Sequence, residues 1–305
     1  MQIAKTALPE TALPAPGAGL MQRLRMSQPL QDLVASVATY AVLVAGCILA
    51  LAPILWGLLT SLKPQAMVAT YPPQWLPSTL SLEHYRALLS RPAILDYFIN
   101  SAILTTATII VCLLVAAPAA YAAARLSFFG KTSLLLTILA TSMIPGISIL
   151  IPIYILAVKA EMLNSYVFMV LVYSAWMIPQ AIWFMKGFIE VVPRELEEAA
   201  VIDGCSTFGI FWRIIIPLIQ PGLAAISILI FMFVWNDFLI GAVLATDEER
   251  RTVQVGLVRF IQDPIGVSWG QFMAFAMLAI APVLVVFLLL QRRFVEGLTS
   301  GSVKG

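Results

Sequence analysis

The chain has 305 residues, of which 61% are hydrophobic and only 11% charged, and its mean hydropathy is +0.95. This composition lies outside the range of soluble globular domains and predicts an all-α membrane protein. The formal net charge of +2 comes from scattered basic residues, which argues against a nucleic-acid-binding surface. Three cysteines and one histidine lack the spacing of a metal site, so we predict no metal and no disulfide.

The N-terminal segment, residues 1–32, is rich in Ala and Pro and is predicted to be a flexible tail. The first apolar run follows, at about residues 36–62. It is too long for the apolar core of a signal peptide and long enough to cross a bilayer core of about 30 Å.

Five further apolar runs can each cross a membrane as a helix, which predicts six transmembrane helices within residues 33–292. They lie at about residues 97–124, 133–158, 166–188, 222–244 and 272–290. Several runs contain prolines, which membrane bundles tolerate as kinks where neighbouring helices satisfy the freed carbonyls; these are Pro53, Pro118, Pro145, Pro152, Pro179 and Pro282.

The distribution of Lys and Arg predicts the orientation of these spans. With the N-terminus inside, eleven of the eighteen basic residues lie on the cytoplasmic side. The excess favours both termini in the cytoplasm. The single histidine, His84, lies in a hydrophilic stretch and is expected to be solvated; no nucleophile and base surround it, so we predict no catalytic residue.

One polar segment on the predicted cytoplasmic side, residues 190–217 between the fourth and fifth spans, has a pattern of its own. Pro193 suits the first position of a helix, acidic residues fill its first turns, and Gly204 suits a left-handed stop. Ser206 or Thr207 can cap a second short helix that returns to the membrane. Physical chemistry alone leaves open whether this hairpin merely connects two spans at the interface or docks on a partner.

The spacing of residues in this hairpin resembles the EAA loop of binding-protein-dependent ABC importer permeases. Glu198-Ala199-Ala200 is followed by three residues, Gly204, nine residues and Ile214-Ile215-Ile216-Pro217, with Ile216 where the family has leucine. The resemblance implies a type I importer permease bundle whose cytoplasmic coupling helix docks on a separate ATPase. The residues it assigns to ATPase coupling are Glu198, Ala199, Ala200, Asp203 and Gly204.

Two further segments resemble the maltose-type, carbohydrate-uptake branch of this family. The C-terminal segment, residues 293–305, is similar to the branch's cytoplasmic tail, which contacts the ATPase subunits; the residues implied are Gly297, Thr299, Gly301 and Lys304. Three glycines disfavour a stable helix from Gly297 onward, and a frayed terminus remains the alternative. The resemblance further implies a second permease, a dimeric ATPase carrying ATP and Mg, an extracytoplasmic solute-binding protein near residues 259–264, and a sugar or sugar derivative as solute.

The fifth span contains Trp235-Asn236-Asp237-Phe238, similar to a segment common in that branch, and these first three residues are candidates for the translocation path. A carboxylate within an apolar helix is costly, so Asp237 should face a cavity or a hydrogen-bonding partner on another helix. A rival hypothesis makes Asp237 the ion site of a stand-alone secondary transporter, and a second makes the chain a membrane scaffold. Gly130-Lys131-Thr132 mimics the end of a P-loop, but Arg125 stands where its first glycine belongs, so the chain should bind no ATP and no cofactor.

Overall fold

The computed structural model describes the backbone of residues 28–261 and 268–300 and the side chains of residues 32–261 and 268–291. Within these ranges the chain is helical and has no β-strand, which confirms the predicted class. The elements in chain order are α2 (Gln28–Ser61), α3 (Gln65–Val68), α4 (Glu83–Leu89), α5 (Pro92–Arg125), α6 (Lys131–Thr141), α7 (Gly146–Lys159), α8 (Tyr166–Val191), α9 (Glu195–Ile202), α10 (Thr207–Ile210), η1 (Phe211–Ile215), α11 (Ile216–Leu218), α12 (Gln220–Trp235), α13 (Leu239–Leu244), η2 (Glu248–Arg250), α14 (Val253–Arg259) and α15 (Trp269–Ser300).

The chain divides into two compact units, residues 1–56 and 57–305, and each is described by itself. Helix α2 makes up the described part of the first unit and ends in the second. Its side chains from 32 to 55 are exposed, and residues 32–61 are long and apolar enough to cross a membrane. Helix α2 begins at Gln28, within the segment predicted to be a tail, and residues 1–27 of that segment lie outside the described residues.

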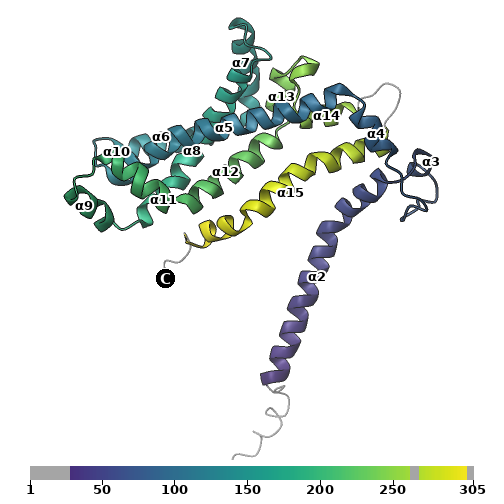
Figure 1. The fold of residues 1–305 in the computed structure, drawn as a ribbon, viewed down its shortest axis with the longest axis horizontal. Helices are drawn as coiled ribbons and strands as arrows, with labels where there is room; N and C mark the ends of the chain where they lie inside the picture. The colour runs from purple at the N-terminus through teal and green to yellow at the C-terminus, as the bar shows by residue number, and fades with distance from the viewer. Residues whose placement is uncertain (1–27, 262–267, 301–305) are drawn as a thin grey trace, which may run out of the picture. The chain divides into compact units, whose positions relative to one another are not determined.

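The second unit is a bundle in which α5 packs along α8, and α12 packs along both α5 and α15 (Figure 1). Alanines on the buried face of α5 allow its close approach to α8; they are Ala116, Ala117, Ala120, Ala123 and Ala124. The core on the α8 side is filled by larger side chains, among them Tyr173, Met177 and Met185. Small residues facing large ones give the close packing that membrane helices use in place of a hydrophobic driving force.

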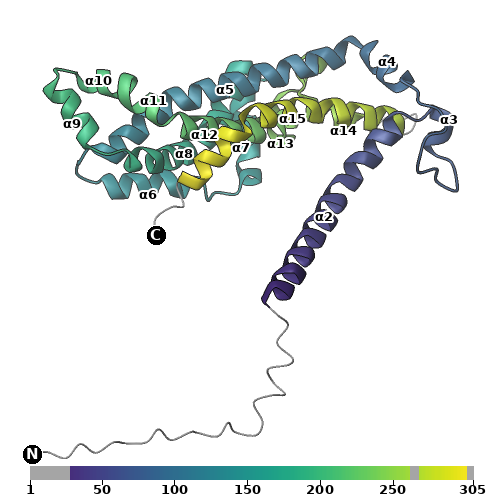
Figure 2. The same ribbon diagram turned by 60° about the horizontal axis from the view of Figure 1, so that its bottom comes forward.

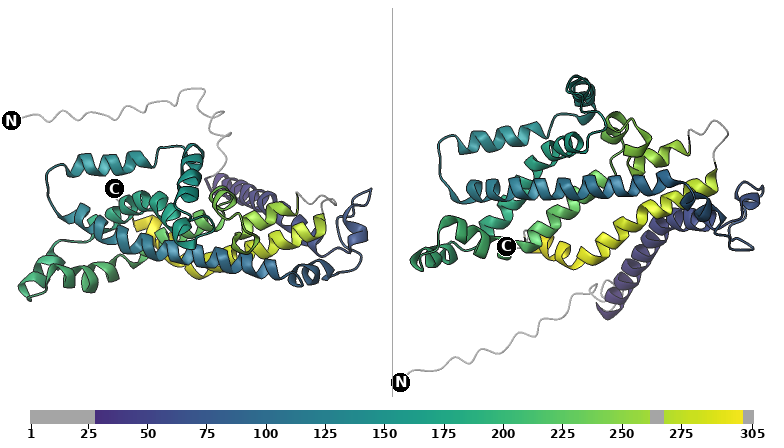
Figure 3. Two further views of the ribbon diagram at one scale, coloured as in Figure 1. Left: turned by 90° about the horizontal axis from the view of Figure 1, so that it is seen from above. Right: turned by 45° about the horizontal axis from the view of Figure 1, so that its top comes forward.

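The bundle has two distinct ends, which the long helix α5 joins. Helices α9 and α10 lie at one end, and α4 and α14 lie at the other (Figure 2). Two further views show the same separation, with α5 running from the blue α4 to the end that carries the green α9 and α10 (Figure 3). The hairpin therefore lies at one end of the bundle, and the segments predicted to be external, around α4 and α14, lie at the other.

Two of the six predicted spans are broken. Four described helices are long and apolar enough to cross a membrane, and two bent pairs bring the number to six if each pair is one span. The predicted third span, residues 133–158, consists of α6 and α7, which meet at 86°. Helix α6 rises about 16 Å and α7 about 21 Å, so neither crosses the bilayer core alone.

The chemistry of residues 142–145 explains this break. Pro145 has no backbone N–H to donate to the preceding turn, and it stands in an extended conformation immediately before α7. The expectation that Pro145 would be an internal kink is therefore wrong. The other five prolines lie inside helices, as predicted. The second bent pair consists of residues 207–218 and α12, which meet at 74°, so its break lies before the predicted fifth span. The predicted fifth span, residues 222–244, is itself interrupted, because α12 ends at Trp235 and α13 begins at Leu239.

His84 corrects another expectation, because it is buried rather than solvated. Its side chain is 3% exposed, and its Nε2 atom lies 2.9 Å from the carbonyl oxygen of Lys63. The ring therefore joins α4 to the turn after α2 in the second unit. A hydrophilic local sequence did not reveal this, since the partner is a backbone carbonyl 21 positions away.

Candidate functional site

The hairpin between the fourth and fifth spans has most of the local structure that its sequence predicts. The expectation that Pro193 takes the first helical position is wrong, because α9 begins two residues later, at Glu195. Helix α9 carries three glutamates in its first turn, where the helix dipole favours negative charge. Gly204 has a φ of 84°, which a residue with a side chain rarely adopts, and it turns the chain after α9. The Ser206 hydroxyl then accepts the Gly209 amide proton at 3.2 Å and caps α10.

One face of α9 points away from the bundle and the other points into it. Glu198, Ala199, Asp203 and Gly204 are exposed, as a docking surface requires. Ala200 is 7% exposed and belongs to the hydrophobic core. The sequence places Ala200 on the docking face, but in the structure its methyl group packs inside the chain.

Glu197 occupies the inward face with Ala200, three residues apart on the helix. Its carboxylate accepts hydrogen bonds from Arg125 Nε at 2.5 Å and from the Tyr121 hydroxyl at 2.9 Å. Arg125 Nη2 also donates to the carbonyl of Val192 at 2.7 Å, just before α9. We call Tyr121, Arg125 and Glu197 the Glu197 clamp. Sequence reasoning missed it. Arg125 at the end of an apolar span was a visible signal, but nothing in the sequence showed that Glu197 is its partner.

The candidates for the translocation path lie where α12 ends, in three different environments. Trp235 is 4% exposed, and its Nε1 donates to the carbonyl of Ala279 at 3.1 Å. Asn236 is exposed. Asp237 Oδ2 accepts from the Tyr173 hydroxyl at 2.9 Å and from the amides of Ile240 and Gly241 at 3.0 and 3.1 Å. Asp237 thus joins α8 to the first turn of α13, which is the hydrogen-bonding partner that the sequence required.

Asn236 lines a cavity of about 280 Å³ between the end of α12 and helices α14 and α15. Gln254 supplies a second carboxamide to this cavity, and the other lining residues are apolar. Carboxamides donate and accept hydrogen bonds without charge, so the cavity suits neutral polar groups. The sequence therefore identified one residue of this cavity and did not identify Gln254.

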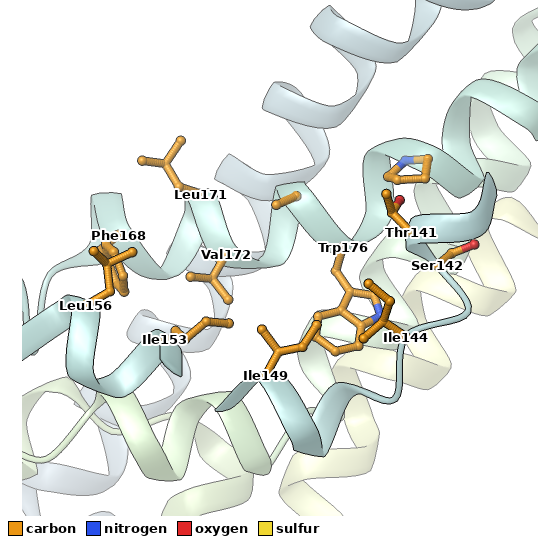
Figure 4. A pocket seen from close by; sticks show the side chains of 12 residues that line it. Thr141, Ser142, Ile144, Ile149, Ile153, Leu156, Phe168, Leu171, Val172 and Trp176 are labelled. Carbon is orange, nitrogen blue, oxygen red and sulfur yellow. The ribbon is translucent and has the colours of Figure 1, made fainter. Parts of the chain in front are cut away.

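A second cavity, of about 380 Å³, lies between the bend that joins α6 to α7 and one face of α8 (Figure 4). Ile149 and Ile153 of α7 face Val172 and Trp176 of α8 across it. The hydroxyl groups at its rim, on Thr141 and Ser142, already donate to carbonyls of α6. Its lining thus offers apolar contact and few free hydrogen-bonding groups.

Several predicted residues lie at or beyond the limit of the structure. Helix α15 continues through Gly297 and Thr299 to Ser300, so the expectation that helical structure is lost from Gly297 is wrong up to that point. Gly301 and Lys304 lie outside the described residues, as do residues 262–264 of the loop after Arg259. No cluster of metal-binding side chains occurs among the residues the structure describes.

Comparison with known proteins is consistent with this geometry. Residues 113–300 match the family model described as binding-protein-dependent transport system inner membrane component. DasC, the permease protein of the diacetylchitobiose uptake system of Streptomyces coelicolor, is 34% identical over 253 residues, which are 83% of this chain and 91% of DasC. SugB, the trehalose transport system permease protein of Mycobacterium tuberculosis, is 34% identical over 261 residues, which are 84% of this chain and 93% of SugB.

A solved structure shares the fold. It is the crystal structure of a bacterial ABC transporter involved in the import of the acidic polysaccharide alginate, with a TM-score of 0.77 at 23% identity. The match covers 88% of this chain and 99% of that chain. The matched family model covers more than half of the sequence, and the curated relatives match over most of their length. The chain therefore belongs to the family of binding-protein-dependent transport system inner membrane components.

Proposed function

We propose that this chain is the permease subunit of an ATP-driven importer for a sugar or sugar derivative, with α9 as the helix that receives the ATPase. Members of its family are transport permeases of the inner membrane and not enzymes, and ATP hydrolysis belongs to a separate subunit. The bundle would alternate between inward-open and outward-open packings, and ATPase closure would set their balance through α9.

The observation that carries the proposal is the exposed face of α9. Glu198, Ala199, Asp203 and Gly204 lie together on it, with no cover from the described part of the chain. The side chains of Val201 and Ile202 are also exposed, at 61% and 86%. Exposed apolar residues beside a carboxylate, at the end of a membrane bundle, suit a protein groove better than water.

On this proposal, the other partners have expected places. Both termini and α9 would lie in the cytoplasm, where a dimeric ATPase holds ATP and Mg, and Gly297, Thr299, Gly301 and Lys304 would contact it. The solute-binding protein would dock at the opposite end, beside α14 and residues 259–264. A second permease, expected to be a different chain, would complete the translocation path.

Support for a sugar as solute comes from relatives and from the cavity beside α12. The relatives named above transport diacetylchitobiose and trehalose, and both molecules are rich in hydroxyl groups. Carboxamides such as those of Asn236 and Gln254 hydrogen-bond hydroxyls without requiring a charge on the solute. Uptake of labelled saccharides of increasing length by the assembled importer tests this class, and exclusive uptake of amino acids or peptides would contradict it.

The coupling role of α9 is tested by Glu198→Lys and Gly204→Pro. Glu198→Lys reverses a charge on the exposed face, and proline cannot adopt the positive φ of Gly204. Both variants are expected to insert into the membrane normally and to lose solute-stimulated ATP hydrolysis and binding of the ATPase in pull-down. Glu190→Lys reverses an exposed charge on α8 and breaks only a surface ion pair with Lys186, which contributes little; it is the matched control and should behave as the wild type. Normal transport by both α9 variants would refute the proposal.

The rival hypothesis of an ion-coupled secondary transporter gains nothing from the structure. Its proposed ion site, Asp237, already accepts three hydrogen bonds from Tyr173 and from the first turn of α13. Reconstitution of this chain alone distinguishes the two hypotheses. We expect no uptake driven by a proton or sodium gradient, and uptake only when the ATPase and the binding protein are present.

A further inference from the structure

The Glu197 clamp ties the hairpin to one particular helix of the bundle. Arg125 is the last residue of α5, and Tyr121 lies one turn before it. The two side chains hold one carboxylate of α9 from 72 and 76 positions away in sequence. Arg125 simultaneously bonds the carbonyl of Val192, in the short linker between α8 and α9. The clamp therefore fixes both α9 and its linker to the end of α5.

The burial of these charges distinguishes the clamp from an ordinary surface ion pair. The side chains of Arg125 and Glu197 are 9% and 13% exposed. Burying two charges is costly, and a well-packed apolar pair often stabilises a fold equally well or better. The clamp is therefore not explained by a gain in stability alone, and its specific geometry points to another role.

The orientation of α9 supplies that explanation. Glu197 is adjacent in sequence to Glu198, and neighbouring helix residues point about 100° apart. Because Glu197 is held inward, Glu198 and Asp203 must point outward. Without the clamp, Ala200 in the hydrophobic core would still keep Glu198 facing outward, but α9 would lose its hydrogen bonds to the end of α5.

Helix α5 is suited to receive a force from α9. Its 34 residues rise about 51 Å, so it runs the full depth of a membrane. At its other end the Asn100 carboxamide donates to the carbonyls of Glu249 and Arg251 at 2.8 Å each. One helix thus holds the hairpin at one end and the loop before α14 at the other.

We propose that Tyr121 and Arg125 are positioning residues: through Glu197 they make α9 and α5 one rigid body, so that movement of the ATPase reaches the bundle rather than being absorbed by the linker. The inference rests on the proposed function, because it requires α9 to receive the ATPase. It assigns a role to three residues that do not touch the ATPase themselves.

The test replaces the clamp without leaving a buried unpaired charge. The double variant Arg125→Met/Glu197→Met should fold and assemble, since apolar pairs of similar size substitute well for buried ion pairs. We expect it to bind the ATPase normally in pull-down and to hydrolyse ATP. The amount of saccharide moved per ATP hydrolysed in liposomes should fall about tenfold, within the range typical of coupling between sites. Tyr121→Phe should lower it about threefold, because it removes one hydrogen bond.

The matched control is the ion pair of Lys186 and Glu190 on α8, which is closer to the solvent and joins two residues of one helix. Lys186→Met/Glu190→Met should leave transport per ATP unchanged. The inference is overturned if the clamp double variant couples as the wild type does, or if it loses ATPase binding as Glu198→Lys does. Failure of the proposed function looks different: Glu198→Lys would then itself transport normally.

Discussion

Replacing Asp237 with alanine is expected to destabilise the bundle by about 1.5–5 kcal/mol. The loss of a side chain that accepts amide protons in the first turn of a helix costs about 0.5–2 kcal/mol. The Tyr173 hydroxyl would also lose its acceptor, and because this side chain is fully buried, the cost is about 1–3 kcal/mol more. Asp237→Asn should cost less, about 1 kcal/mol, since its amide oxygen can accept from the same donors without the charge.

The assay is reversible unfolding of the purified chain by sodium dodecyl sulfate in mixed micelles, which gives the free energy of unfolding of each variant. Asn236→Ala is the control, because the Asn236 side chain is exposed and its carboxamide bonds only a carbonyl of its own helix. We expect that control to stay within about 0.5 kcal/mol of the wild type. An Asp237→Ala variant equally close to the wild type would refute the reasoning, as would Asp237→Asn being as costly as Asp237→Ala.

Two other predictions concern backbone packing and the loop before α14. Gly146→Ala would place a Cβ atom 2.2 Å from the Trp176 ring and should destabilise the bundle by about 1–3 kcal/mol. Gly187 has open space around it, so Gly187→Ala should instead stabilise α8 by about 0.5–1 kcal/mol. Thermal unfolding in detergent measures both variants, and equal effects would contradict this account. Asn100→Ala removes two hydrogen bonds that hold the loop, so trypsin should cleave after Arg251 several times faster than in the wild type, and an unchanged rate would show that these bonds do not restrain the loop.

The two glutamates at positions 197 and 198 show how function and anchoring can be divided between adjacent residues. Glu197 bonds Tyr121 and Arg125 on the inward face of α9, which leaves Glu198 on the exposed face. On the proposed function, Glu198 is therefore the glutamate that can contact the ATPase. The Glu198→Lys and clamp variants should therefore have opposite phenotypes, one losing the ATPase and the other keeping it without transmitting its movement. Both phenotypes follow from the direction in which each side chain leaves the same short helix.

Local chemistry in the sequence was sufficient for the helical class, most of the spans and the shape of the hairpin. Apolar runs of about 20 residues can satisfy their backbone in lipid only as helices, so their structure does not depend on distant contacts. Gly204 and Ser206 act within a few residues of their own position, through a positive φ and a side-chain cap. The family resemblance likewise rested on local patterns, in the hairpin, in the fifth span and at the C-terminus.

The tertiary structure decided which of several equivalent local signals was realised. Pro118 and Pro179 lie within continuous helices, whereas Pro145 stands at a break of 86°, although each is a proline in an apolar run. Glu197 faces inward and Glu198 is exposed because the partner of Glu197, Arg125, stands 72 positions away at the end of another helix. Contacts of this kind depend on how helices pack in three dimensions, and the sequence of either helix alone does not contain that information.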